Sequence, residues 1–366
     1  MNPGTLTDEA TLLIAALRDN LFTKLGTALT TTSLTAALAV PKTHKAHPLV
    51  HLVRAASKVR STTELQVLAN LDAAIGACHR DVSGDAHRWA CAQVESAAHE
   101  TELANASSLL AEVRAFGTLW NAGLDVKSAR KSRVQKTYDF DVMLGSSAFA
   151  VEVHCKQMNT PQANSLAAFS ATGDPGTRVI YPAGAPKNKE TTAENVASKF
   201  AQIKPRGGQA SVQKPTVLWL DLQDEDWWGL MPSHAEPFSV SQQLYFSGGL
   251  WHAFYGRVST PMFEYHTTDE LAFTGVPAMQ HPGLFEQSKN WAGAILSFPK
   301  GTAFFENPDA PMPVDDHIRA AICKLSWFDV QRSRMSWPPN SDTVADRLSR
   351  DRADLSELAR VAIYHL

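Results

Sequence analysis

The sequence predicts an α/β protein in which an all-α N-terminal domain precedes a core with the element order helix, strand, strand, strand, helix, strand. Three observations lead to this fold class. Residues 5–104 have helical spacing of apolar residues with almost no strand signal, residues 138–155 contain two apolar runs split by a turn, and residues 216–222 form one apolar run typical of a buried strand. We therefore divide the chain into an all-α domain (1–104), an α/β core (105–310) and a helical C-terminal segment (311–366).

The helices are predicted from apolar periodicity. Alanine- and leucine-rich periodic segments cover residues 63–78 and 86–104. The core begins with a helix in which Leu109, Val113, Phe116 and Trp120 recur on one face, and this helix ends at Gly123, a residue type that favours helix C-termini. Thr191 and Glu194 form a capping box for a later helix that continues to Ile203, and residues 341–363 have the pattern of a terminal helix.

The strands are predicted from short apolar runs. A weak strand follows Gly123, and residues 138–144 and 148–155 form a hairpin around the turn Gly145-Ser146-Ser147. Residues 291–298 and 302–305 form a second strand pair.

Composition excludes several classes of protein. The 366 residues are 44% hydrophobic and 19% charged, which excludes a disordered, collagen-like or coiled-coil chain. Four scattered cysteines do not form a disulfide framework and are typical of a reducing compartment. The start Met1-Asn2-Pro3 lacks the basic region of a signal peptide, and no stretch has 18 uninterrupted apolar residues. We therefore expect a cytoplasmic protein that does not enter membranes.

The hairpin carries the candidate chemistry. Because strand side chains alternate between faces, Asp139 and Asp141 share one face, and folding at the turn brings them beside Glu152. Ala150, His154 and Lys156 share the face of Glu152. Carboxylates on a buried sheet require compensation, and a divalent cation supplies it. Mg²⁺ is commonly held by one or two carboxylates together with waters and substrate phosphates.

In this order of elements, these residues resemble the PD-(D/E)xK nuclease superfamily, whose restriction-endonuclease-like fold has an αβββαβ core with a mixed sheet. Residues 105–222 match that order, and the run from Glu112 through Trp120 to Glu152 is similar to the resolvase-type branch. The resemblance implies that Asp139 and Glu152 hold Mg²⁺, with Mn²⁺ as an alternative ion. It assigns Glu112 to the acidic position of the first helix and leaves Asp141 as an alternative metal ligand.

The activity that the resemblance implies is endonucleolytic hydrolysis of phosphodiester bonds, with restriction-like defence as the analogous biology. One position departs from the motif: the lysine of (D/E)-x-K is expected at residue 154, where this chain has His154. Three interpretations remain open. Lys156 supplies the cation, His154 orients or deprotonates the attacking water, or the site is degenerate and binds without cutting. A purely structural adaptor is the remaining alternative.

Basic residues cluster around the candidate site despite a formal net charge of −3. Residues 42–60, 120–136 and 186–214 carry +5, +4 and +4, as counted from Lys, Arg, Asp and Glu. Such groups bind backbone phosphates. We therefore expect DNA as the substrate, with RNA and a homodimeric state left open. The residues expected to contact nucleic acid are Lys127, Arg130, Lys131, Arg133, Lys136, Lys204 and Arg206.

Overall fold

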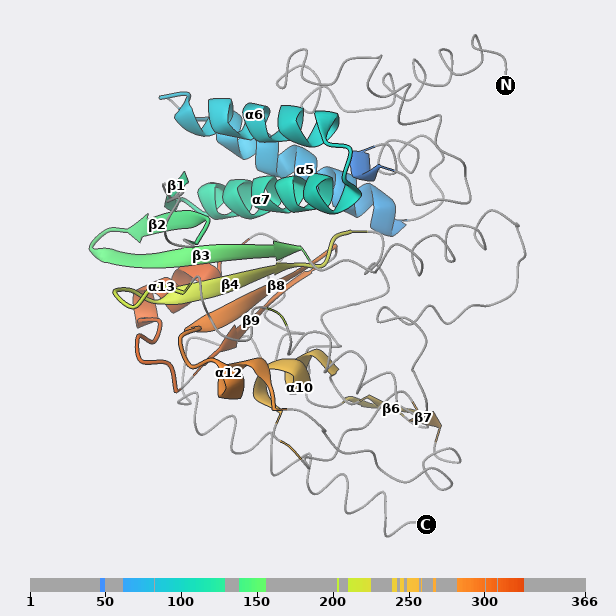
Figure 1. The fold of residues 1–366 in the computed structure, drawn as a ribbon, viewed down its shortest axis with the longest axis vertical. Coiled ribbons are helices and arrows are strands. Elements are labelled where there is room, and N and C mark those ends of the chain that lie inside the picture. Colours follow the sequence, from blue (N-terminus) through green and yellow to red (C-terminus); the bar gives the residue numbers. More distant parts are fainter. Residues whose placement is uncertain are drawn as a thin grey trace. The chain divides into compact units, whose positions relative to one another are not determined.

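The fold is mixed α/β. The computed structural model describes residues 47–49, 62–81, 83–128, 138–155, 203, 210–224, 239–241, 244–246, 249–256, 258, 266–267, 282–299, 301–307 and 309–325. Within these ranges, a six-stranded mixed sheet has the strand order β1-β2-β3-β4-β8-β9 (Figure 1). Its strands are β1 (Asp125–Ser128), β2 (Phe140–Leu144), β3 (Ser147–Cys155), β4 (Thr216–Asp221), β8 (Gly293–Phe298) and β9 (Gly301–Glu306).

A smaller antiparallel sheet and six helices complete the described elements. The small sheet has the order β5-β6-β7, formed by Ser239–Ser241, Leu244–Phe246 and His266–Thr267. The helices are α5 (Thr62–His79), α6 (Asp85–His99), α7 (Leu103–Asn121), α10 (Gly249–Tyr255), α12 (Leu284–Gln287) and α13 (Asp316–Ile322). No helix in the described ranges has both the length and the apolar character needed to cross a lipid bilayer.

The chain divides into two compact units. The first unit comprises residues 1–127, 153–179 and 220–228, and the second comprises residues 128–152, 180–219 and 229–366. The predicted domain boundaries at residues 104 and 310 stay predictions.

Small side chains form the core of the first unit. Helices α5, α6 and α7 pack against one another (Figure 1). Many of their buried residues are alanines, and α5 and α7 approach so closely that a Cβ atom on Gly117 would lie 2.3 Å from the carbonyl oxygen of Ala74. The helices predicted for residues 63–78 and 86–104 are confirmed as α5 and α6, although α6 ends at His99. The helix predicted through Leu109 and Trp120 is confirmed as α7, which begins earlier than predicted, at Leu103.

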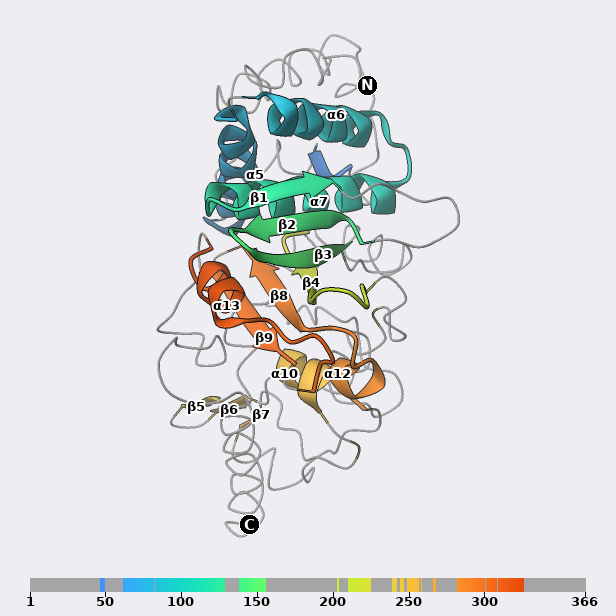
Figure 2. The same ribbon diagram turned by 90° about the vertical axis from the view of Figure 1, so that its left-hand side faces the viewer.

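Aromatic side chains dominate the core of the second unit. Among the described residues, the largest fully buried side chains all belong to this unit: Phe140, Phe149, Trp219, Phe254, Trp291, Phe298, Phe304 and Phe305. Phe254 of α10 packs against Phe305 of β9 and Phe285 of α12, with ring centroids 5.2 and 5.3 Å apart. Arg319 of α13 forms an ion pair with Glu306 at the end of β9, which holds this helix beside the strand (Figure 2).

Both predicted strand pairs are confirmed in the second unit. Strands β8 and β9 are antiparallel neighbours. In the β2–β3 hairpin, Leu144 pairs with Ser147, so the turn contains only Gly145 and Ser146 and is one residue shorter than predicted. Gly145 has φ +60°, a conformation that glycine adopts at no steric cost.

The predicted core order is found for α7, β1, β2, β3 and β4. The helix predicted to follow Thr191 and the terminal helix over 341–363 lie outside the described residues, apart from Ile203, which is buried. The N-terminal all-α domain and the restriction-endonuclease-like arrangement therefore stay predictions.

We predict that Gly117→Ala destabilises the protein by about 1–3 kcal/mol, because its new methyl group overpacks the contact with Ala74. Helix propensity alone predicts the opposite sign, a gain of about 1 kcal/mol. Urea unfolding monitored by circular dichroism measures the change. The control is Ser108→Ala on the same helix, whose hydroxyl bonds only locally to the carbonyl of Ala104. A Gly117→Ala protein as stable as the wild type would contradict the close packing of α5 and α7.

Candidate functional site

The register of the β2–β3 hairpin positions the predicted carboxylates. Phe140 pairs with Val151 and Asp141 pairs with Ala150. Beyond the last of these pairs, the amide of Asp139 donates a hydrogen bond of 3.0 Å to the carbonyl of Val151. This bond is offset by one residue from the strand register, so the regular pairing ends at Phe140 and Val151, and the backbone of Asp139 lies beside Val151, the neighbour of Glu152. That folding of the hairpin brings the carboxylates of Asp139 and Glu152 together stays a prediction.

An apolar face fixes that register. Phe140, Val142, Phe149 and Val151 alternate with the acidic positions and are at most 1% exposed. Because a slip of one residue would exchange the two faces of a strand, burial of these four side chains strongly specifies the pairing. Asp141 and Glu152 consequently share the opposite face of the hairpin; together with Asp139, just before β2, they form what we call the acidic face.

The acids of this face differ in their exposure. Glu152 is only 1% exposed, whereas the side chain of Asp141 is 36% exposed and Asp139 is half-buried. Burial of an ionised carboxylate is costly unless positive charge or hydrogen-bond donors compensate it. Glu152 is therefore the acid whose position on the sheet most requires a compensating group.

Lys214 lies against the acidic face. The carbonyl of Pro215 accepts a 2.8 Å hydrogen bond from the amide of Ala150, which ties the segment before β4 to the middle of β3. From there, the Lys214 ammonium reaches Oδ1 of Asp141 and lies 4.8 Å from the centre of the Tyr138 ring. The Tyr138 hydroxyl donates a 2.9 Å hydrogen bond to the same carboxylate oxygen.

The charge of Lys214 is stabilised by these contacts. Partial burial opposes the ammonium, but the interactions with Asp141 and Tyr138 outweigh it and raise the pKa of Lys214 above its ordinary value. From the sequence, Lys214 was only one member of the basic run over residues 186–214 and was not predicted to lie at the site. No local signal marks it, because it contacts a residue 73 positions away in the chain.

Three of the other predicted site residues lie on α7, β3 and β1, and the rest lie outside the described residues. Glu112 is half-buried on α7, and His154 is half-buried near the end of β3, two residues beyond Glu152; both belong to the first unit. Lys127 is exposed on β1, where its ammonium lies 3.1 Å from Asp125. The remaining predicted residues lie outside the described ranges: Lys156, Arg130, Lys131, Arg133, Lys136, Lys204 and Arg206.

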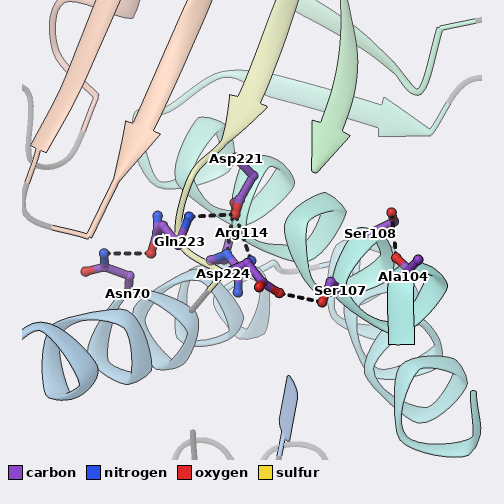
Figure 3. A network of polar contacts seen from close by, with 8 residues as sticks. All are labelled: Asn70, Ala104, Ser107, Ser108, Arg114, Asp221, Gln223 and Asp224. Carbon is purple, nitrogen blue, oxygen red and sulfur yellow. Dashed lines mark hydrogen bonds and ion pairs between the residues drawn. The ribbon is translucent and has the colours of Figure 1, made fainter. Parts of the chain in front are cut away.

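A second polar cluster is buried within the first unit (Figure 3). Nε and Nη2 of Arg114 donate two 2.9 Å hydrogen bonds to the two carboxylate oxygens of Asp221. Oδ1 of Asp221 also accepts a hydrogen bond from the amide of Gln223, whose side chain accepts one from Asn70. Ser107 donates a 2.6 Å hydrogen bond to Asp224.

This buried network joins α5 and α7 to the end of β4. Burial opposes the charge of Arg114, but the facing carboxylate of Asp221 outweighs it and raises the pKa of the guanidinium. The sequence analysis did not identify this network. The available signal was an arginine inside the apolar run of α7, between Val113 and Ala115.

The acidic face is chemically suited to a hard divalent cation. It offers oxygen donors from two opposed strands, and one of its carboxylates is buried. Mg²⁺ needs only one or two protein carboxylates when waters and phosphates complete its coordination. Within the described ranges, no group of three or more His, Cys, Asp or Glu side chains is arranged to hold a metal ion.

Comparison with known proteins adds no relative: no family model, curated protein or solved structure matches the chain.

We predict that Arg114→Met destabilises the protein by about 3–5 kcal/mol, because it leaves the buried Asp221 carboxylate without its guanidinium. Lys127→Met is the matched control, since it removes an exposed partner of Asp125 and should cost less than about 1 kcal/mol. Urea unfolding compares the two variants.

The double variant Arg114→Met/Asp221→Leu should recover most of the lost stability, since no buried charge remains. Equal stabilities of Arg114→Met and Lys127→Met would refute the structural role of the buried ion pair.

Proposed function

We propose that the protein is a divalent-metal-dependent nuclease that hydrolyses phosphodiester bonds of DNA, with Asp139 and Glu152 as the metal ligands. The observation that supports this proposal is the β2–β3 hairpin, in which the backbone of Asp139 bonds to Val151, the neighbour of the buried Glu152. Two nearby carboxylates, one of them buried, are stabilised by a divalent cation, and a phosphodiesterase site uses that cation for chemistry.

The residues have separate roles in this proposal. Bound Mg²⁺ supplies a water of lowered pKa and neutralises negative charge on the phosphate. Glu152 fixes the ion because the strand and its burial hold the carboxylate in place. Asp139 immediately precedes β2 and contributes the second oxygen ligand. His154 and Lys156 remain the sequence-predicted candidates for orienting the attacking water.

DNA is proposed as the substrate because of charge placement. The basic run from Lys127 to Lys136 immediately precedes Asp139, and the run over 186–214 ends at Lys214 beside the acidic face. A phosphate backbone binds to such groups with a strong dependence on salt concentration.

A second candidate function is DNA binding without cleavage. The observation that favours it is His154, which stands where the nuclease motif has its lysine. The two candidates differ in one measurable property, because both predict salt-dependent DNA binding and only the nuclease predicts strand breakage.

We predict that Asp139→Asn and Glu152→Gln each slow cleavage of plasmid DNA in Mg²⁺ or Mn²⁺ by about 100-fold or more, because each weakens the electrostatic stabilisation of the reacting phosphate. EDTA should abolish cleavage by the wild type. Gel electrophoresis of plasmid and of a labelled RNA measures the rates and distinguishes the two substrates.

The matched control is Asp125→Asn, an exposed acid on the neighbouring strand, which should cleave as the wild type does. Equal cleavage by the wild type and both site variants would overturn the assignment of the ligands. DNA binding without cleavage under any metal would favour the second candidate, and neither binding nor cleavage would favour a structural adaptor.

A further inference from the structure

Among the acids of the acidic face, Asp141 contacts a lysine and a tyrosine. Oδ1 of Asp141 is already bound by the Tyr138 hydroxyl and by the Lys214 ammonium. This carboxylate oxygen therefore faces a cation from the protein itself. The sequence left Asp141 as an alternative metal ligand to Asp139 and Glu152, and this contact gives it a different role.

The position of Lys214 is fixed at three points. The Ala150–Pro215 backbone hydrogen bond places its backbone beside β3, Asp141 holds its ammonium, and the Tyr138 ring lies under the charge. Lysine loses more side-chain entropy than most residues when it is immobilised. An ammonium held by several contacts on a candidate phosphate-binding face has the placement expected of a preorganised charge.

Exposure distinguishes this ion pair from two others in the described chain. The side chains of Lys214 and Asp141 are 24% and 36% exposed, so a ligand can reach the ammonium. The Arg114–Asp221 pair is closed, with side chains at most 4% exposed, and the Lys127–Asp125 pair is largely in solvent. Lys214 is thus both held in place and accessible.

We propose that Lys214 is the phosphate-binding cation of this site and that Asp141 positions it instead of binding the metal ion. This inference rests on the proposed nuclease function and names a residue for the role left open by His154. Lys214 donates hydrogen bonds to a phosphate oxygen and stays protonated. It makes and breaks no covalent bond, and it does not accept the proton of the attacking water.

The test compares Lys214→Met and Lys214→Arg with the wild type, using Lys289→Met as an exposed control in the same unit. Single-turnover cleavage of duplex DNA, calorimetric Mn²⁺ affinity and the thermal unfolding midpoint are measured for each protein. We expect Lys214→Met to cleave about 100-fold more slowly, with Mn²⁺ affinity and the unfolding midpoint close to those of the wild type. Lys214→Arg should recover part of the rate, and Lys289→Met should cleave normally.

Asp141→Asn tests the positioning role. It should slow cleavage by about 10-fold, less than Lys214→Met, without weakening Mn²⁺ binding. A clear loss of Mn²⁺ affinity in Asp141→Asn would make Asp141 a metal ligand and overturn that part of the inference.

The competing cations are tested by Lys156→Met and His154→Gln. Normal cleavage by Lys214→Met, together with loss in either of these variants, would overturn the role of Lys214 and leave the nuclease function intact. If the wild type does not cleave DNA, the proposed nuclease function fails, and the role of Lys214 is tested by the affinity of the protein for duplex DNA in Ca²⁺. Phosphate binding by Lys214 predicts that Lys214→Met binds the duplex about 10-fold more weakly, and that the slope of log affinity against log salt concentration becomes smaller by about one. An unchanged affinity and an unchanged slope would overturn the role of Lys214.

Discussion

The hydrogen-bond register between β2 and β3 is the constraint on which the candidate site depends. Phe140 opposite Val151 places one pair of side chains in the apolar core, and Asp141, which pairs with Ala150, and Glu152, two residues beyond Ala150, consequently fall on the other face. A slip of one residue would bury the wrong set of side chains. The large free energy of burying the apolar face thus maintains an arrangement of carboxylates that is unfavourable by itself. The pairing of β2 with β3 therefore both stabilises the sheet and positions the acids of the acidic face.

Two ion pairs show how burial separates a structural role from a functional one. Arg114 and Asp221 are almost completely buried and joined by two hydrogen bonds, so their charges are used within the protein. Lys214 and Asp141 are joined through one carboxylate oxygen and remain partly accessible. Replacing a contact in the first pair disrupts packing, whereas the second pair can exchange a protein contact for a ligand contact. This difference in exposure is why we place the proposed phosphate-binding cation at Lys214 rather than at Arg114.

Much of the local structure could be predicted because it is encoded by nearby residues. The apolar spacing of α7, the alternation in the hairpin and the buried run of β4 each follow from a short stretch of sequence. Contacts between distant residues could not be predicted in the same way. Lys214 reaches Asp141 across 73 positions and Arg114 reaches Asp221 across 107, and neither pair has a characteristic spacing. The sequence therefore indicated which acids share a strand face, but not which cations the fold brings to them.

The most direct test of the central claim is the position of Mn²⁺ in a crystal of the protein, located by anomalous diffraction. The account predicts a single strong peak shared by the carboxylates of Asp139 and Glu152, at a distance of about 2.0–2.2 Å from an oxygen of each. Lys214 should remain outside the coordination sphere, next to Asp141. A crystal containing Mn²⁺ in which these two carboxylates point apart, with no ion between them, would contradict the account.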